Sequence, residues 1–184
     1  MRHSRGFGVQ SPSDYRFIRY VVNEHWPYYA YDEIKTKFSD IDKDTLRLCR
    51  LYLRIANWRQ PEVIFDYCPS SMAYAKYMQA GCRRSRVMTF DDAKLFLEQG
   101  LADVFGLCRM SLVGDYRMVY EKLMELADSR SVLIIENISC DKTSKSFWRE
   151  VCDDSRTGVT FDLYYCGIVF FNKQRYKQHY IVNF

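Results

Sequence analysis

The sequence predicts an α/β protein with a mostly parallel sheet, a C-terminal antiparallel hairpin and a helical N-terminal part. Short apolar runs alternate with helical stretches of about ten residues, which is typical of β-α-β units. Residues 131–135 form a continuous aliphatic run of the kind found in buried central strands. The last two apolar runs, 159–164 and 167–171, have a short connection, so we expect them to pair antiparallel.

The first sixty residues read as helical. Ser11 and Pro12 form a helix-start signal, and the apolar positions of 17–22 follow at helical spacing. A tyrosine-rich connector, 28–31, leads into a second helical stretch, and a third amphipathic helix ends before Pro61. We therefore expect a helical extension over residues 1–60 and an α/β domain over residues 61–184, together forming one compact unit.

The remaining elements follow from the same periodicities. We expect further strands at 63–65, 86–90 and 110–113, and helices at 72–80, 93–100, 117–127 and about 145–152. Only 17 residues separate Asp92 from Met110, and residues 103–105 are the only candidate there for a further strand. The third strand is thus predicted to be short or missing.

Composition excludes several classes of protein. The longest strongly apolar stretch, 163–171, is about half the roughly 18 residues that a membrane helix needs, and the N-terminus lacks the apolar core of a signal peptide, so we expect a cytoplasmic protein. The seven cysteines include no C-x-x-C pair and the three histidines are scattered, which argues against a zinc site or a disulfide scaffold. The net charge of +4 comes from residues 1–92, where arginines alternate with aromatic residues. This pattern indicates either a weak RNA-binding patch or a solvated helix face.

Acidic residues stand at the ends of several predicted strands. In an open parallel sheet, ligands bind beyond the carboxyl ends of the strands, near the point where the strand order reverses. Asp66, Asp91, Asp115 and Glu136 occupy such positions. The alternative interpretation is that some of them only stabilise the following helices, since acidic groups favour helix N-termini.

The order of elements, the strand-end acids and the ending 161–171 together resemble a class I S-adenosylmethionine-dependent methyltransferase. The opening 6–12 resembles the Gly-Val-His-Ser-Pro of a bacterial subfamily with a helical N-terminal extension, with Gln10 at the histidine position, and residues 177–180 resemble its terminal segment. The resemblance implies a Rossmann-like methyltransferase fold that binds S-adenosylmethionine. It also implies that Asp66 anchors the amine side and Asp91 the ribose, with Tyr116 or Glu136 acting near the methyl acceptor.

The chain departs from the family at the cofactor turn. The resemblance aligns Asp66, Cys68, Ser70 and Asp91 with cofactor-binding positions, but Cys68, Ser70 and Met72 stand where the family has glycines. Glycines there let the backbone approach the cofactor closely. We therefore expect these side chains to fill the cofactor cleft or to distort the loop.

The metal site of metal-dependent O-methyltransferases is also incomplete. Asp115, Glu136 and Asn137 are the candidate ligands for a magnesium ion, but Val113 stands where the family has an aspartate. Asp115 could replace that aspartate only if its loop moved.

Three functions stay open. The first is a methyltransferase-like protein with a degraded cofactor site that binds a small molecule or a protein partner; the second is an active methyltransferase with a modified pocket. The third is an RNA-associated protein. The tyrosines of 28–31 either pack the extension over the sheet or stack on an adenine or another base.

Overall fold

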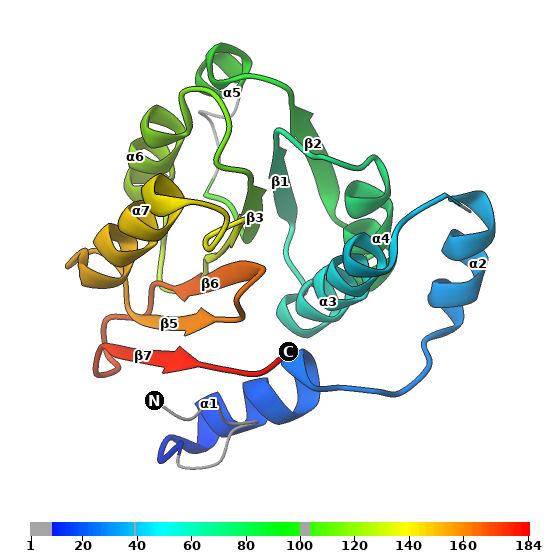
Figure 1. Ribbon diagram of the computed structural model, residues 1–184, viewed down its shortest axis with the longest axis horizontal. Helices are drawn as coiled ribbons and strands as arrows, with labels where there is room; N and C mark the ends of the chain where they lie inside the picture. Colours follow the sequence, from blue (N-terminus) through cyan, green and yellow to red (C-terminus); the bar gives the residue numbers. More distant parts are fainter. Residues whose placement is uncertain (1–8, 39, 100–103) are drawn as a thin grey trace.

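A seven-stranded sheet lies at the centre of the computed structural model, which describes residues 9–38, 40–99 and 104–184 (Figure 1). The strand order is β2-β1-β3-β4-β6-β5-β7. β1, β2, β3 and β4 are parallel, and β6 runs antiparallel to both β4 and β5, as the sequence predicted. The strands are β1 (Val63–Tyr67), β2 (Arg86–Phe90), β3 (Leu107–Met110), β4 (Val132–Glu136), β5 (Val159–Asp162), β6 (Cys166–Phe170) and β7 (Gln178–Ile181).

Helices cover both faces of this sheet. The helices are α1 (Pro12–Phe17), the π-helical turn η1 (Ile18–Val22), α2 (Tyr29–Lys37), α3 (Lys43–Arg59), α4 (Ala73–Gly81), α5 (Ala93–Gln99), α6 (Tyr116–Leu126) and α7 (Lys142–Asp153). Side chains alternate along each strand, so Ile134 of β4 packs with α3 and α4 while Leu133 and Ile135 pack with α6 and α7. The result is a three-layer α/β/α arrangement (Figure 1).

The N-terminal helices form where the sequence predicts them, with one difference. Ser11 caps α1 by accepting a hydrogen bond from the backbone N–H of Asp14, and α3 ends at Gln60, which has a left-handed φ of 51°. The predicted connector 28–31 is wrong in part, because α2 already begins at Tyr29. Buried residues of α1, α2 and α3 share one hydrophobic core with the sheet, and the boundary at residue 60 stays a prediction.

One strand is displaced from its predicted position. The strand expected at 110–113 lies at Leu107–Met110 instead. The prediction missed this position because Arg109 interrupts the apolar run, and charged side chains usually lie on the protein surface. Val104 and Phe105, the described part of the candidate third strand, are not in a strand; Asp103 lies outside the described residues. Within the described residues, β2 pairs with β1 alone, and the next strand along the chain is β3, which follows α5.

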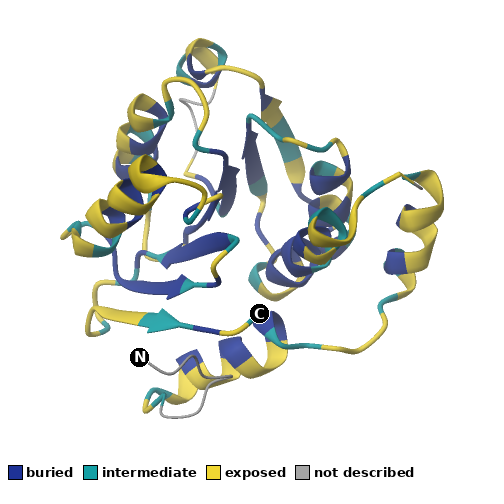
Figure 2. Cartoon of the chain, viewed as in Figure 1, coloured by how far each residue is buried: buried dark blue, intermediate teal, exposed yellow. Residues whose placement is uncertain are grey.

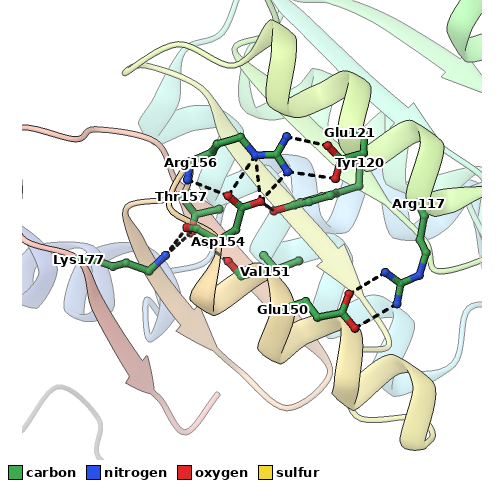
Figure 3. A network of polar contacts seen from close by, with 9 residues as sticks. All are labelled: Arg117, Tyr120, Glu121, Glu150, Val151, Asp154, Arg156, Thr157 and Lys177. Atoms are coloured by element: carbon green, nitrogen blue, oxygen red, sulfur yellow. Dashed lines mark hydrogen bonds and ion pairs between the residues drawn. The ribbon is translucent and has the colours of Figure 1, made fainter.

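The edge strand β7 was not predicted as a strand. Its half-exposed polar sequence pairs parallel with β5, and Figure 2 shows it far less buried than the central strands. Lys177, just before β7, donates to Thr157 Oγ1 at 2.9 Å and to the carbonyl of Asp154 after α7 (Figure 3). Arg156 binds both Asp154 and Glu121 of α6. These contacts tie the edge strand to α7 and α7 to α6.

No helix within residues 9–38, 40–99 and 104–184 is both long and apolar enough to cross a membrane.

Candidate functional site

The strand order reverses between β1 and β3, and this point brings three charged side chains together. The chain leaves β1 toward β2 and enters β3 on the other side of β1, which defines the crevice where ligands bind in open α/β sheets. Asp66 and Arg109 are partners in the register of the two strands. Glu136 ends the next strand, β4. Each of the three comes two residues after an apolar residue of the same strand that packs in the core with α3 and α4, so all three side chains point to the face covered by these helices.

Arg109 is fully buried and every nitrogen of its guanidinium has a partner. Nε donates to Asp66 Oδ1, Nη1 lies 3.1 Å from Glu136 Oε2, and both charged partners are almost completely buried. Nη1 also donates to Ser111 Oγ at 2.8 Å, and Nη2 donates to the carbonyl of Tyr67 at 2.5 Å. Such complete pairing is what permits a guanidinium in a sheet interior.

Two tyrosines from the covering helices complete this group. Tyr52 of α3 donates its hydroxyl to Glu136 Oε1 at 2.5 Å. Tyr74 of α4 lies with its ring centre 5.2 Å from Cζ of Arg109 and packs edge-on against Tyr52. We call Tyr52, Asp66, Tyr74, Arg109, Ser111 and Glu136 the Arg109 cluster.

The Arg109 cluster holds one positive charge against two carboxyl groups. Burial raises the pKa of Asp66, and the neighbouring Arg109 opposes that rise. Asp66 Oδ2 is buried without a hydrogen-bond partner. Burial also holds the pKa of Tyr52 well above its ordinary value, so its hydroxyl keeps the proton that it donates to Glu136.

The loops beyond β1, β2 and β3 are bonded to one another across the crevice. Cys68, after β1, donates its N–H to the carbonyl of Phe90 at 2.7 Å and its thiol to the carbonyl of Asp91 at 3.0 Å. Ser111, after β3, donates its hydroxyl to the carbonyl of Cys68 at 2.8 Å. The hydroxyl of Tyr67 donates to the carbonyl of Val113 at 3.0 Å. Backbone groups at the mouth of the crevice are therefore used within the protein.

The turn after β1 keeps a glycine-like backbone at one position. Cys68 has a φ of 45°, in the left-handed region that glycine adopts most readily. Ser70 is exposed, and its hydroxyl lies 3.3 Å from that of Tyr74. Met72 is 74% exposed, so the expectation that it fills the crevice is wrong. The side chains above Asp66 and Arg109 come instead from Tyr52 and Tyr74.

The other predicted site residues lie apart from one another. Asp91 is exposed after β2, whereas Asp66 is buried in β1. The ring of Tyr116 packs on Phe147, 4.9 Å between centres, on the face of α6 and α7. Glu136 points to the opposite face, toward α3. The structure thus does not bring Tyr116 and Glu136 together.

The three candidate metal ligands have separate surroundings. Asp115 is exposed immediately before α6, and Glu136 is buried in the Arg109 cluster. Asn137 has a φ of 59° and donates its N–H to the carbonyl of Tyr165 at 2.8 Å. Among the described residues, no three His, Cys, Asp or Glu side chains form a group that could hold a metal ion.

Comparisons with solved structures give the fold. No family model and no curated protein matches the sequence. The SAH-bound methyltransferase PaMTH1 of Podospora anserina is similar over 90% of this chain and 97% of its own, with a TM-score of 0.58 and 12% identity. The O-methyltransferase TomG of Streptomyces achromogenes, in complex with SAM, is similar over 83% and 92%, with a TM-score of 0.55 and 11% identity. A methyltransferase from Geobacter sulfurreducens is similar over 84% and 94%, with a TM-score of 0.54 and 13% identity.

The chain has the class I methyltransferase fold. This confirms the Rossmann-like architecture, with its mostly parallel sheet and C-terminal antiparallel hairpin, that the sequence predicted. Within this fold, the Arg109 cluster lies at the carboxyl ends of the central strands. Sequence reasoning placed Asp66 and Glu136 there but missed Arg109, Tyr52 and Tyr74. Because alternate residues of a strand share a face, treating 107–111 as a strand would have placed Arg109 on the same face as Leu107, and so beside Asp66.

Proposed function

We propose that this chain is a methyltransferase-fold protein that transfers no methyl group and that acts by binding a small molecule or a protein. The observation that carries the proposal is the buried pairing of Arg109 with Asp66. Asp66 is the residue that the family resemblance assigns to the amine side of S-adenosylmethionine. In this chain, Arg109 already supplies the positive charge that the carboxylate would otherwise receive from a ligand.

Electrostatics further oppose the cofactor. S-adenosylmethionine carries a sulfonium and an ammonium group, both positive. At the base of the crevice, Arg109 already pairs with both Asp66 and Glu136, so these carboxyl groups attract an incoming positive group less than two unpaired carboxylates would. The rings of Tyr52 and Tyr74 cover the same charged group and are themselves buried. The residues of the crevice therefore do not fit the cofactor.

Calorimetric titration with S-adenosylmethionine and S-adenosylhomocysteine tests the proposal. We expect no binding heat and no rise in the unfolding temperature with either compound, since a ligand that binds only the folded state raises its stability. Micromolar binding that is lost in Asp91→Ala would contradict the proposal. Thr89→Ala is the matched control, because Thr89 is an exposed residue of β2 two positions before Asp91.

An active methyltransferase with a modified pocket is the second candidate. One observation favours it: Asp91, the residue that resembles the family's ribose-binding acid, lies exposed at the end of β2 and free to accept hydrogen bonds from a ligand. Methyl transfer also depends largely on proximity and orientation, so it needs no strong general base. The same titration decides between the two candidates.

Three narrower expectations from the sequence remain part of this proposal. We place the protein in the cytoplasm, consistent with seven cysteines that are all free thiols. We expect no functional magnesium site, because Asp115 and Glu136 have separate surroundings. An RNA-associated role for the basic N-terminal part would give a salt-dependent mobility shift with bulk RNA.

A further inference from the structure

A cavity of about 450 Å³ lies between α3 and the segment that joins η1 to α2. This volume is within the range of small-molecule sites. The cavity is distinct from the Arg109 cluster, and none of the residues that line it belongs to that cluster. Figure 1 shows the C-terminus close to the blue helical segment of the N-terminal part, and Phe184, the last residue, is part of the cavity lining.

One wall of the cavity is basic. Lys43, Arg47, Arg50 and Arg54 follow one another on a single face of α3, at intervals of three or four residues. Arg54 is structural, because it is buried and donates to the carbonyls of Val21 and Val22 and to the hydroxyl of Tyr31. The lining holds two acids, Glu24 and Asp32, so positive charge is in excess.

Two buried hydrogen-bond donors in this lining have no partner. Nε of Arg50 and Nδ2 of Asn23 are both inaccessible to solvent and make no hydrogen bond. Buried polar groups are almost always satisfied, so exceptions call for a specific explanation. Because both atoms are donors, the group that would satisfy them is an acceptor, and an anionic oxygen satisfies a guanidinium best.

The remaining wall is aromatic. Trp26 is 75% exposed, Tyr28 is half-buried, and Tyr31 stacks on Arg50 with 5.0 Å between Cζ and the ring centre. Cζ of Arg47 lies 4.4 Å from the ring centre of Phe184. Exposed indole and phenol rings next to guanidinium groups form a platform on which a flat ring can stack.

We infer that this cavity binds a small organic phosphate that carries a flat ring, of the size of a mononucleotide. The phosphate contacts the guanidinium groups of Arg47 and Arg50, and the buried Arg50 Nε and Asn23 Nδ2 donate to it when their side chains turn toward the cavity. The ring stacks against Trp26 and Tyr28. The inference does not rest on the proposed function. S-adenosylhomocysteine has no phosphate, so the two sites respond to different compounds and can fail separately.

Calorimetric titration with adenosine diphosphate tests the inference. We expect one bound molecule per chain, competition by inorganic phosphate, and much weaker binding of adenosine. Arg47→Glu and Arg50→Ala should each weaken binding by at least about tenfold, since each removes a charged contact to the phosphate. Quenching of Trp26 fluorescence should follow the same titration and disappear in Trp26→Leu.

Controls separate binding from folding. Arg83→Ala removes an exposed arginine in the turn before β2 and should leave binding unchanged. Arg50→Lys keeps the charge and loses Nε, so it should also weaken binding; thermal unfolding checks that each variant is folded.

Three results would overturn the inference. The first is no binding at millimolar nucleotide, which would mean that water alone fills the cavity. The others are equal binding by Arg47→Glu, Arg50→Ala and Arg83→Ala, and adenosine binding as tightly as the diphosphate. A single-stranded RNA oligonucleotide that binds far more tightly than the mononucleotide, through the same arginines, would replace the inference with an RNA site.

Discussion

Arg109 and Arg50 both stack on a tyrosine ring but differ in whether their guanidinium nitrogens have hydrogen-bond partners. Each stacks on a tyrosine ring, Arg109 on Tyr74 at 5.2 Å and Arg50 on Tyr31 at 5.0 Å. Every nitrogen of Arg109 is bonded within the protein, whereas Nε of Arg50 is buried and unbonded. Arg109 in the fold's usual ligand crevice is therefore satisfied, although Asp66 Oδ2 beside it has no hydrogen-bond partner, whereas Arg50 beside the peripheral cavity is not satisfied.

This difference indicates where a ligand can gain binding energy. A ligand in the crevice finds Arg109 already satisfied and could gain a hydrogen bond there at Asp66 Oδ2, whereas a ligand in the cavity supplies the acceptor that Arg50 lacks. Unpaired buried donors cost free energy in the free protein, and an incoming acceptor removes that cost. We therefore expect the Arg109 cluster to act mainly as a structural core and ligand binding to take place among the N-terminal helices.

Removing Arg109 should have the largest effect on the stability of the protein. Arg109→Met leaves Asp66 and Glu136 buried without their counter-charge, and we expect the free energy of unfolding to fall by about 3 to 5 kcal/mol. Denaturant unfolding measures it. Arg117→Met is the matched control, since Arg117 pairs with Glu150 on the surface (Figure 3), where such pairs contribute about 0.2 to 1 kcal/mol. Equal losses in the two variants would contradict the assignment of Arg109 to the core.

Tyr52→Phe should have the next largest effect. It removes the hydroxyl that donates to Glu136 Oε1 but leaves the pairing of Glu136 with Arg109. We expect a loss of about 1 to 3 kcal/mol in the free energy of unfolding, the cost of one unsatisfied buried acceptor. Tyr20→Phe, at an exposed tyrosine, should cost nothing measurable in the same denaturant experiment. A neutral Tyr52→Phe would mean that the hydroxyl contact is not formed in solution.

Asp66 gives the cluster a pH dependence. Burial raises the pKa of Asp66 in the folded state above its ordinary value, so the folded chain holds this proton more tightly than the unfolded chain. The associated stability is complete below the ordinary pKa of about 4 and is lost as the pH rises through the folded pKa, by about 1.4 kcal/mol for each pH unit between the two values. The difference in unfolding free energy between the wild type and Asp66→Asn, followed from acidic to neutral pH, measures this loss. A difference that does not change with pH would refute it.

Arg50→Met should have the smallest effect on stability. It removes a buried unpaired donor and keeps apolar volume against Tyr31, so we expect a change within about 1 kcal/mol, of either sign. Denaturant unfolding of Arg50→Met and Arg109→Met side by side compares directly how much each arginine contributes to the free energy of unfolding. A loss as large as that of Arg109→Met would show that Arg50 is part of the core.

The sequence predicts the fold better than it predicts the site. The aliphatic run 131–135, the Ser11 helix start and the short connection before Cys166 each depend on local patterns, and each was confirmed. β3 was misplaced and the Arg109 cluster was missed for one reason: a buried arginine looks like a surface residue until its partners are known. β7 was missed because its residues Gln178 to Ile181 are too polar to be recognised without the strand beside them.

Both regions share a single helix. α3 has 17 residues, about 25 Å of rigid rod, and carries Tyr52 toward the sheet and Arg50 toward the cavity. The hydroxyl of Tyr52 lies 2.5 Å from Glu136, a contact that a shift of half an ångström lengthens appreciably. A ligand in the cavity that displaces α3 would therefore also move Tyr52 relative to Glu136 at the centre of the sheet, because Arg50 and Tyr52 are only two residues apart on this helix.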